Sequence, residues 1–117
     1  MPGNLGTTAI KQLTSLLSLK GGFYSGTLSG ALTMDGTYGN IVKLDPGGAH
    51  RDVTLPAEEG RSGALFWIVN AADAAENLVV KDDAANTIVT INQNESAVVS
   101  CNGTAWSLVA VVAIALS

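Results

Sequence analysis

The strongest constraint on the fold is a series of short β-type segments that occupies the chain from residue 40 to about residue 112. Each segment is rich in Val, Ile, Leu and Thr, and Gly, Pro, Asn or Asp separate one segment from the next. The first group of residues favours strands and the second favours turns. Helical periodicity is nearly absent after residue 20. The pattern therefore predicts an all-β fold, either an antiparallel β-sandwich or a small, β-tulip-like barrel.

Alternating apolar and polar residues set the bounds of the expected strands. These are residues 40–44, 51–55, 65–69, 78–81, 87–91, 97–101 and 104–112. The last four segments are expected to form two hairpins. Asn102-Gly103, in the turn of the second hairpin, is the preferred pair for a type I′ turn, in which both central residues take positive φ.

Two of the expected strands, within residues 65–69 and 106–112, are apolar on both faces. Such a strand must be covered on both sides. Charged residues make up only 14% of the chain and hydrophobic residues 47%, so a monomer would expose apolar patches. Burial against other copies of the chain is the expected remedy. The residues expected at this subunit interface are Leu65, Trp67, Val69, Leu108, Val109 and Val111.

The first twenty residues differ in composition from the rest of the chain. Residues 1–20 contain two lysines and no acid, a charge of +2, whereas residues 21–117 contain four basic and ten acidic residues, a charge of −6. Leucines at three- and four-residue spacing suggest one face of a short helix, but the interleaved Thr and Ser are weak helix formers. We expect an extended or partly helical N-terminal arm that is ordered by the partner it contacts. The expected contact residues are Ile10, Lys11, Leu13, Leu16, Leu17, Leu19 and Lys20.

A glycine pair, Gly21-Gly22, separates this arm from a stretch rich in Gly, Ser and Thr that continues to residue 39. That stretch is expected to be a connector with one or two short strands, one of them near residues 32–34. The expected organisation is an arm and connector at residues 1–39 and a β-domain at residues 40–117.

The candidates for catalysis or metal binding are few. His50 is the only histidine, and a catalytic role would require a nucleophile and a partner such as Asp52. Cys101 is the only cysteine, so it cannot form an intrachain disulfide, and we expect it to be buried on a strand. The acids Asp82 and Asp83 suggest calcium, but their spacing does not match an EF-hand loop and is typical of a hairpin turn. The sequence predicts no enzyme, no metal and no cofactor.

Charge and apolar run length also limit the partners. An acidic body argues against nucleic acid, because phosphate binding needs clustered Lys and Arg. The longest apolar run spans residues 108–116, whereas a membrane-spanning helix needs about 20 apolar residues. We therefore expect neither nucleic acid nor a membrane as a partner, and we expect the chain to bind other proteins, including copies of itself.

Four motifs, taken in order, carry a resemblance to a known family. They are Leu44-Asp45-Pro46-Gly47-Gly48, Val53-Thr54-Leu55-Pro56, Ile68-Val69-Asn70 and Cys101-Asn102-Gly103-Thr104-Ala105-Trp106. Together they resemble a β-domain of tailed-bacteriophage capsid decoration (cement) and head-fibre proteins, over about residues 40–109. Residues 1–39 contain no matching motif.

The resemblance implies a homotrimer on the outer capsid surface of a virion, where an arm contacts the major capsid protein and stabilises the shell. The β-domain would then be the trimerisation domain, and residues 1–39 would be the capsid anchor. The resemblance implies no catalytic residues. An alternative within the same family is a head- or tail-fibre segment that attaches to a host surface or a glycan.

Overall fold

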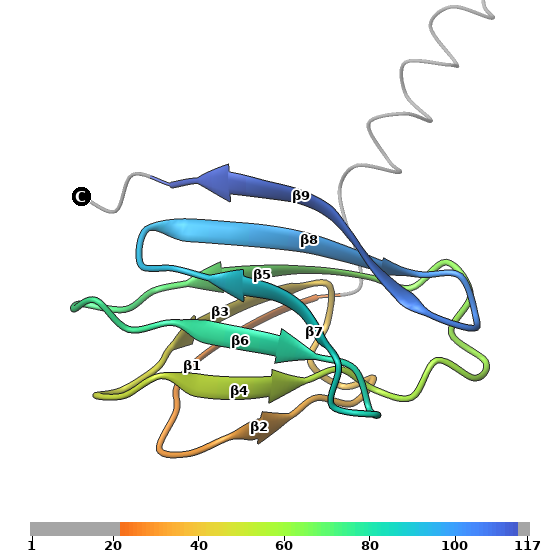
Figure 1. The fold of residues 1–117 in the computed structure, drawn as a ribbon, viewed down its shortest axis with the longest axis horizontal. Coiled ribbons are helices and arrows are strands. Elements are labelled where there is room, and N and C mark those ends of the chain that lie inside the picture. The colour runs from red at the N-terminus through yellow and green to blue at the C-terminus, as the bar shows by residue number, and fades with distance from the viewer. Residues whose placement is uncertain (1–21, 115–117) are drawn as a thin grey trace, which may run out of the picture.

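The computed structural model of the protein describes residues 22–114, and this range contains strands and no helix. The all-β prediction is confirmed, and the expected strands from residue 40 onward agree with the observed bounds within two residues. The strands (Figure 1) are β1 Phe23–Thr27, β2 Leu32–Thr33, β3 Ile41–Asp45, β4 Arg51–Thr54, β5 Leu65–Asn70, β6 Leu78–Lys81, β7 Thr87–Ile91, β8 Glu95–Cys101 and β9 Trp106–Ala113.

The strands form two sheets, one of five strands in the order β1-β3-β5-β8-β9 and one of four in the order β2-β4-β6-β7. From β1 to β6 the chain passes from one sheet to the other at every connection. Neighbouring strands in this part therefore run in the same direction, and the pairs β1–β3, β3–β5, β2–β4 and β4–β6 are parallel. The expected antiparallel arrangement is wrong for this part of the chain, because alternation of apolar residues shows which face is buried but not which way a strand runs.

The last strands are antiparallel, as predicted. The β6–β7 and β8–β9 hairpins are confirmed, and β8 also pairs antiparallel with β5. The β8–β9 turn is not type I′, because Gly103 has a positive φ of 93° but Asn102 does not. Instead the Asn102 side-chain oxygen accepts hydrogen bonds from the N–H groups of Thr104, at 2.9 Å, and Ala105, at 2.8 Å. An Asn side chain can close a turn in this way without a positive φ of its own.

The described part of the expected connector belongs to the two sheets. The backbone N–H of Leu28 donates to the Asp45 carbonyl, and that of Met34 donates to the Thr54 carbonyl, each at 2.8 Å. The side chains of Leu28 and Met34 lie in the same core as the rest of the domain. Residues 22–39 are therefore an integral part of the β-fold. The arm residues expected to contact a partner, from Ile10 to Lys20, lie outside the described residues.

One apolar core lies between the sheets. Phe66 and Trp106 stack with ring centroids 5.5 Å apart, and the Trp106 indole N–H donates to the Pro56 carbonyl at 2.8 Å. Cys101 is buried, as predicted. The main core side chains are Leu28, Met34, Val42, Leu44, Val53, Leu55, Phe66, Ile68, Leu78, Val80, Ile91, Ala97, Val99 and Trp106.

A buried asparagine joins this core to the loop after β5. Asn70 is fully buried, and its Nδ2 donates to the carbonyls of Glu76, at 2.8 Å, and Ile91, at 3.0 Å. Its Oδ1 accepts from the N–H of Ala72 at 2.9 Å. Every polar atom of the Asn70 side chain is thus bonded, as a buried amide requires.

Candidate functional site

The outer face of the five-stranded sheet carries an apolar row that crosses every strand. The strand register aligns Phe23, Ile41, Trp67, Val98 and Ala110 on β1, β3, β5, β8 and β9. Phe23 is 63% exposed and Trp67 is 36% exposed. An exposed apolar row of this extent on a small domain is typical of a surface that contacts another protein.

The indole of Trp67 keeps its polar atom satisfied inside the chain. Its Nε1 donates to the Ser96 Oγ at 2.9 Å, and Ser96 itself is buried. Since the N–H is already bonded, the exposed part of the ring is apolar and needs no polar partner from outside. The adjoining row of the same face contains Lys43, Val69 and Val112, so one charged side chain borders the apolar surface.

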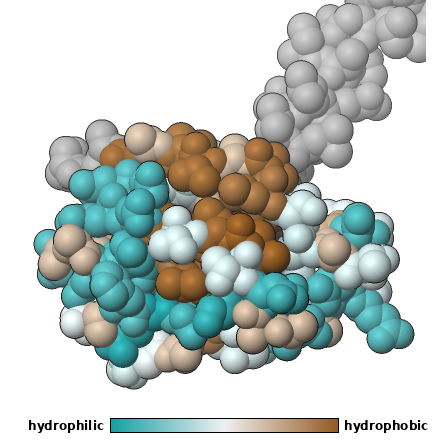
Figure 2. All heavy atoms as spheres, viewed as in Figure 1, coloured by the Kyte–Doolittle hydropathy of each residue, from teal (hydrophilic) through white to brown (hydrophobic). Residues whose placement is uncertain are grey.

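Strand β9 is exposed on both of its faces. Leu108 pairs with Val99 and Val111 pairs with Ala97, and both partners are core residues, so Leu108 and Val111 lie on the inner face of the sheet. Each is nevertheless 44% exposed. Figure 2 shows hydrophobic residues gathered at the β9 side of the molecule, whereas hydrophilic residues predominate over β4 and β2. Val109 is 59% exposed and lies at a β-bulge, where the register with β8 shifts.

The residues predicted for a subunit interface therefore fall into two groups. Leu65, Trp67 and Val69 lie on the outer face of the five-stranded sheet, with Phe66 and Ile68 turned into the core. The β9 residues on the inner face form a second group on the other side of the same sheet. The sequence pattern did not separate the groups, because it does not reveal that β9 lies at a sheet edge.

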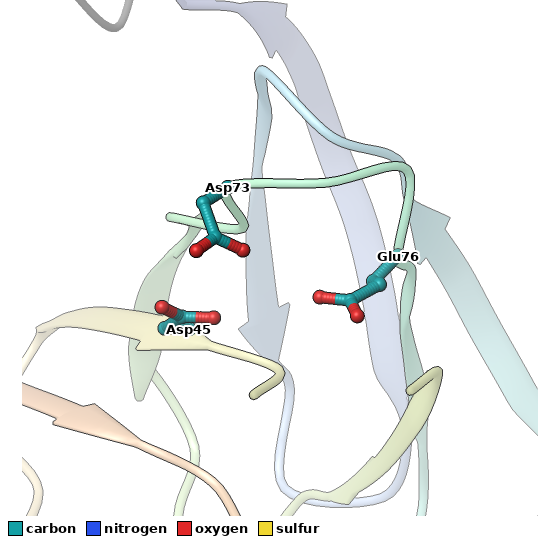
Figure 3. A group of neighbouring side chains, drawn as sticks. All are labelled: Asp45, Asp73 and Glu76. Carbon is teal, nitrogen blue, oxygen red and sulfur yellow. The ribbon is translucent and has the colours of Figure 1, made fainter. Parts of the chain in front are cut away.

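Three carboxylates from two segments of the chain converge at the end of β3 (Figure 3). Asp45 ends β3, whereas Asp73 and Glu76 lie in the loop before β6, and one oxygen of each lies within 4.8 Å of the others. Glu76 Oε1 is buried and has no hydrogen-bond partner. Hard cations bind carboxylate oxygens, so these residues could hold one. No pattern in the sequence indicated this group, because Asp45 joins Asp73 and Glu76 only after folding.

The acids that suggested calcium in the sequence are turn residues. Asp82 accepts hydrogen bonds from the backbone and side chain of Asn86 and from the Ala84 N–H, and these bonds lower the pKa of Asp82. Nearby, a hydrogen bond from its own backbone lowers the pKa of Glu58, but desolvation, a side-chain hydrogen bond with Asp83 and the charges of Asp83 and Asp82 together raise it. Asp82 therefore stabilises the turn between β6 and β7, and Glu58 lies close to that turn.

The residues considered for catalysis make structural contacts. His50 is exposed, and its Nδ1 accepts a hydrogen bond from the Asn77 N–H at 2.8 Å. The carboxylate of Asp52 pairs with Lys81 at 3.1 Å. The sulfur of Cys101 accepts from the Gly103 N–H at 3.3 Å. Among residues 22–114, the hydrogen bond of His50 and the ion pair of Asp52 involve Asn77 and Lys81, not each other or a nucleophile as in a triad.

A small pocket of about 220 Å³ lies where β3 and β5 begin. The Asn40 side-chain N–H donates to the Leu65 carbonyl at 2.7 Å, and the Arg61 Nε donates to the Ala57 carbonyl at 3.0 Å. The Asn40 amide and the Arg61 Nε therefore each donate to a backbone carbonyl of the same chain. The pocket is lined by Gly36, Gly39, Asn40, Arg61, Ala64, Leu65 and Phe66.

Comparison with models of known protein families gives no match, and no curated protein matches the chain. Among residues 22–114 there is no helix of the length and hydrophobicity needed to cross a membrane.

Proposed function

We propose that this chain is a structural virion protein that decorates the outer surface of a phage capsid as a homotrimer and stabilises the shell. Two observations support the proposal. The motif order over residues 40–109 resembles the decoration-protein β-domain. Independently, β9 and the outer face of the five-stranded sheet expose apolar side chains that a second copy would cover. The exposed β9 strand is the observation that carries the proposed self-association.

The energetics favour burial of β9. Full burial of a Val or Leu side chain contributes roughly 1.5–3 kcal/mol. Leu108, Val109, Val111 and Val112 are each about half exposed, at 44%, 59%, 44% and 41%, so burying what remains contributes about 1 kcal/mol for each. Trp67 adds a larger apolar surface on the outer face. A closed oligomer gains this contribution from every copy, which offsets part of the entropy lost on association.

The capsid anchor is proposed for residues 1–21, because residues 22–39 are used in the two sheets. This segment carries the leucines and the two lysines Lys11 and Lys20, opposite in charge to the acidic body. Three anchors joined through one trimer would bind with avidity, so each single contact can be weak. Capsid subunits held by such a clamp can separate only if several contacts break together.

Sedimentation equilibrium at micromolar concentration tests the self-association. We expect about three times the 11.9 kDa monomer mass, and a monomer at every concentration would overturn the proposal. Deletion of residues 1–20 should leave the oligomer intact and abolish co-sedimentation with capsids of the parent phage. Retained binding would remove the anchor assignment, and specific micromolar binding to a glycan array would favour the fibre alternative instead.

A further inference from the structure

The two sheets differ by one strand, and β9 is the strand without a counterpart. In the orders β1-β3-β5-β8-β9 and β2-β4-β6-β7, β7 ends the shorter sheet and contacts both β8 and β9. Within residues 22–114 no strand lies beyond β7 in its sheet. β7 lies close to β9, but the four-stranded sheet ends there (Figure 1). This explains why Leu108 and Val111 point to the core side of their sheet and yet remain 44% exposed. One strand position beside β7 and facing β9 is missing.

The strands on either side of this position are open edges. β7 and β9 are the last strands of their sheets, so each presents backbone groups along its outer side that can pair with another strand. Natural edge strands are usually protected by charged residues or proline. Neither Thr87–Ile91 nor Trp106–Ala113 contains a charged residue or a proline. Both edges are suited to receive a further strand.

We propose that β9 of a second copy of this chain occupies the missing position. It would pair along the free edge of β7 and cover the inner face of β9. The strand that fits must be free of charge and apolar on the face that meets Leu108 and Val111. Among the described edge strands, β9 has these properties, and it is long enough to cover β9 of the first copy. The proposal rests on the self-association proposed above.

The contact is heterologous, since each copy donates β9 to one neighbour and receives β9 from another. Such contacts form closed rings when the rotation between copies closes. A ring of three copies places three β9 strands around the axis, with their apolar inner faces covered. An eight-residue strand is about 27 Å long, and a strip that combines the ~5 Å strand spacing with the ~10 Å sheet spacing covers on the order of 400 Å² on each copy. One contact therefore buries about 800 Å² in total, less than a standard interface of ~1,200–2,000 Å². In a closed ring each copy makes two such contacts, and both must break before that copy can leave.

The first test is Val111→Lys, which places a charge on the inner face of β9. We expect the sedimentation mass to fall to that of a monomer. The matched control is Thr33→Lys on β2, whose side chain lies on the outer face of the four-stranded sheet and should leave the mass unchanged. Circular dichroism checks that both variants keep the β-sheet spectrum. A folded Val111→Lys variant that keeps the oligomeric mass overturns the inference.

A second test detects the strand pairing directly and does not require a substitution that breaks the interface. In a Cys101→Ser background, Thr90→Cys on β7 is mixed with Val109→Cys or Val112→Cys on β9 and oxidised. Paired strands lie about 5 Å apart and permit a disulfide, whereas facing sheets lie about 10 Å apart and do not. We expect a disulfide-linked dimer only in a mixture of a β7 variant with a β9 variant. A dimer from either β9 variant alone would show β9–β9 pairing and overturn the inference.

The two proposals fail in distinguishable ways. A wild-type monomer overturns the proposed self-association. A wild-type oligomer that Trp67→Lys dissociates and Val111→Lys does not would keep the self-association and place the contact on the outer face of the five-stranded sheet instead.

Discussion

The outer faces of the two sheets differ sharply in chemistry. On the four-stranded sheet, the outward residues are mainly Thr, Asp and Lys, and Lys81 forms an ion pair with Asp52 across β6 and β4. On the five-stranded sheet, an apolar row runs from Phe23 to Ala110. Both sheets share the same core, so packing inside the domain does not explain the difference. One face is suited to water, and the other is suited to contact with protein.

The largest expected effect comes from breaking the core that both faces share. Asn70→Ala removes a buried amide and its three hydrogen bonds, which join it to the carbonyls of Glu76 and Ile91 and to the Ala72 N–H. We expect a loss of ~3 kcal/mol in the free energy of unfolding, because buried unsatisfied groups are costly. Urea unfolding of wild type and variant measures it. A loss below about 1 kcal/mol would show that water replaces these bonds.

Reversing the chemistry of the apolar face is expected to have the next largest effect. Trp67→Lys should weaken self-association about 30-fold, which corresponds to ~2 kcal/mol of lost apolar burial. Thr33→Lys adds the same charge to the polar face, at the edge of the four-stranded sheet far from β7, and should leave the dissociation constant unchanged. Sedimentation of both variants over a concentration series provides the comparison. Equal weakening by the two substitutions would remove the distinction between the faces.

The carboxylate group at the end of β3 should respond to loss of one charge. Glu76→Gln reduces repulsion among Asp45, Asp73 and Glu76. We expect an increase of about 0.5–1 kcal/mol in stability when the protein is unfolded in EDTA. The substitution keeps the shape of the side chain, so packing is unchanged and the variant needs no separate packing control. A decrease in the stability of Glu76→Gln in EDTA would show that a positively charged group already compensates the three carboxylates.

On the polar face, the ion pair should contribute little. Lys81→Ala removes the partner of Asp52, whose side chain is 49% exposed. Exposed ion pairs contribute ~0–1 kcal/mol, and we expect about 0.5 kcal/mol at low salt and less at about 0.5 M salt. Thermal unfolding at two salt concentrations measures the contribution. A larger effect that does not respond to salt would indicate that the Lys81 stem, not its charge, supports the face.

The smallest effect is expected from the Asp82 turn at low pH. Hydrogen bonds from Asn86 and Ala84 lower the pKa of Asp82 below its ordinary value of 3.8. The folded state therefore favours the charged carboxylate, so Asp82 contributes stability above that value and the contribution is lost as pH falls through the lowered pKa. Between about pH 5 and about pH 2.5, wild type should lose slightly more stability than Asp82→Asn. If the stability of wild type and of Asp82→Asn fell equally between these pH values, this role of Asp82 would be contradicted.

The strands after residue 40 could be predicted because each has a clear alternation and a turn at its end. The β8–β9 hairpin, for example, follows from Asn102-Gly103 between two apolar segments, although the turn itself is closed by the Asn102 side chain. The parallel pairing could not be predicted, since it depends on the path between the sheets. The short strand expected near residues 32–34 is present as β2, but the sequence did not show that β1 and β2 pair with β3 and β4 and so belong to the two sheets.

The candidate site was predictable in its residues but not in its arrangement. Leu65 and Trp67 were recognised from their apolar strand, and Leu108 and Val111 from theirs. Which face each group occupies depends on sheet order and on the four-stranded sheet ending at β7. The group of Asp45, Asp73 and Glu76 was missed because Asp45 is 28 residues before Asp73, and only the fold brings the end of β3 to the loop that carries Asp73 and Glu76.

The passage of the chain between the sheets has a consequence for the order of folding. Strands β1 to β5 pair with no strand adjacent in the chain, so these pairings need long loops to close first. The β6–β7 and β8–β9 hairpins are the first local pairs that the chain offers. We therefore expect folding to begin in the C-terminal half. The N-terminal half, which leaves the ribosome first, should stay unfolded until the C-terminal half has been synthesised. Truncation of β9 should then impair folding of strands synthesised long before it.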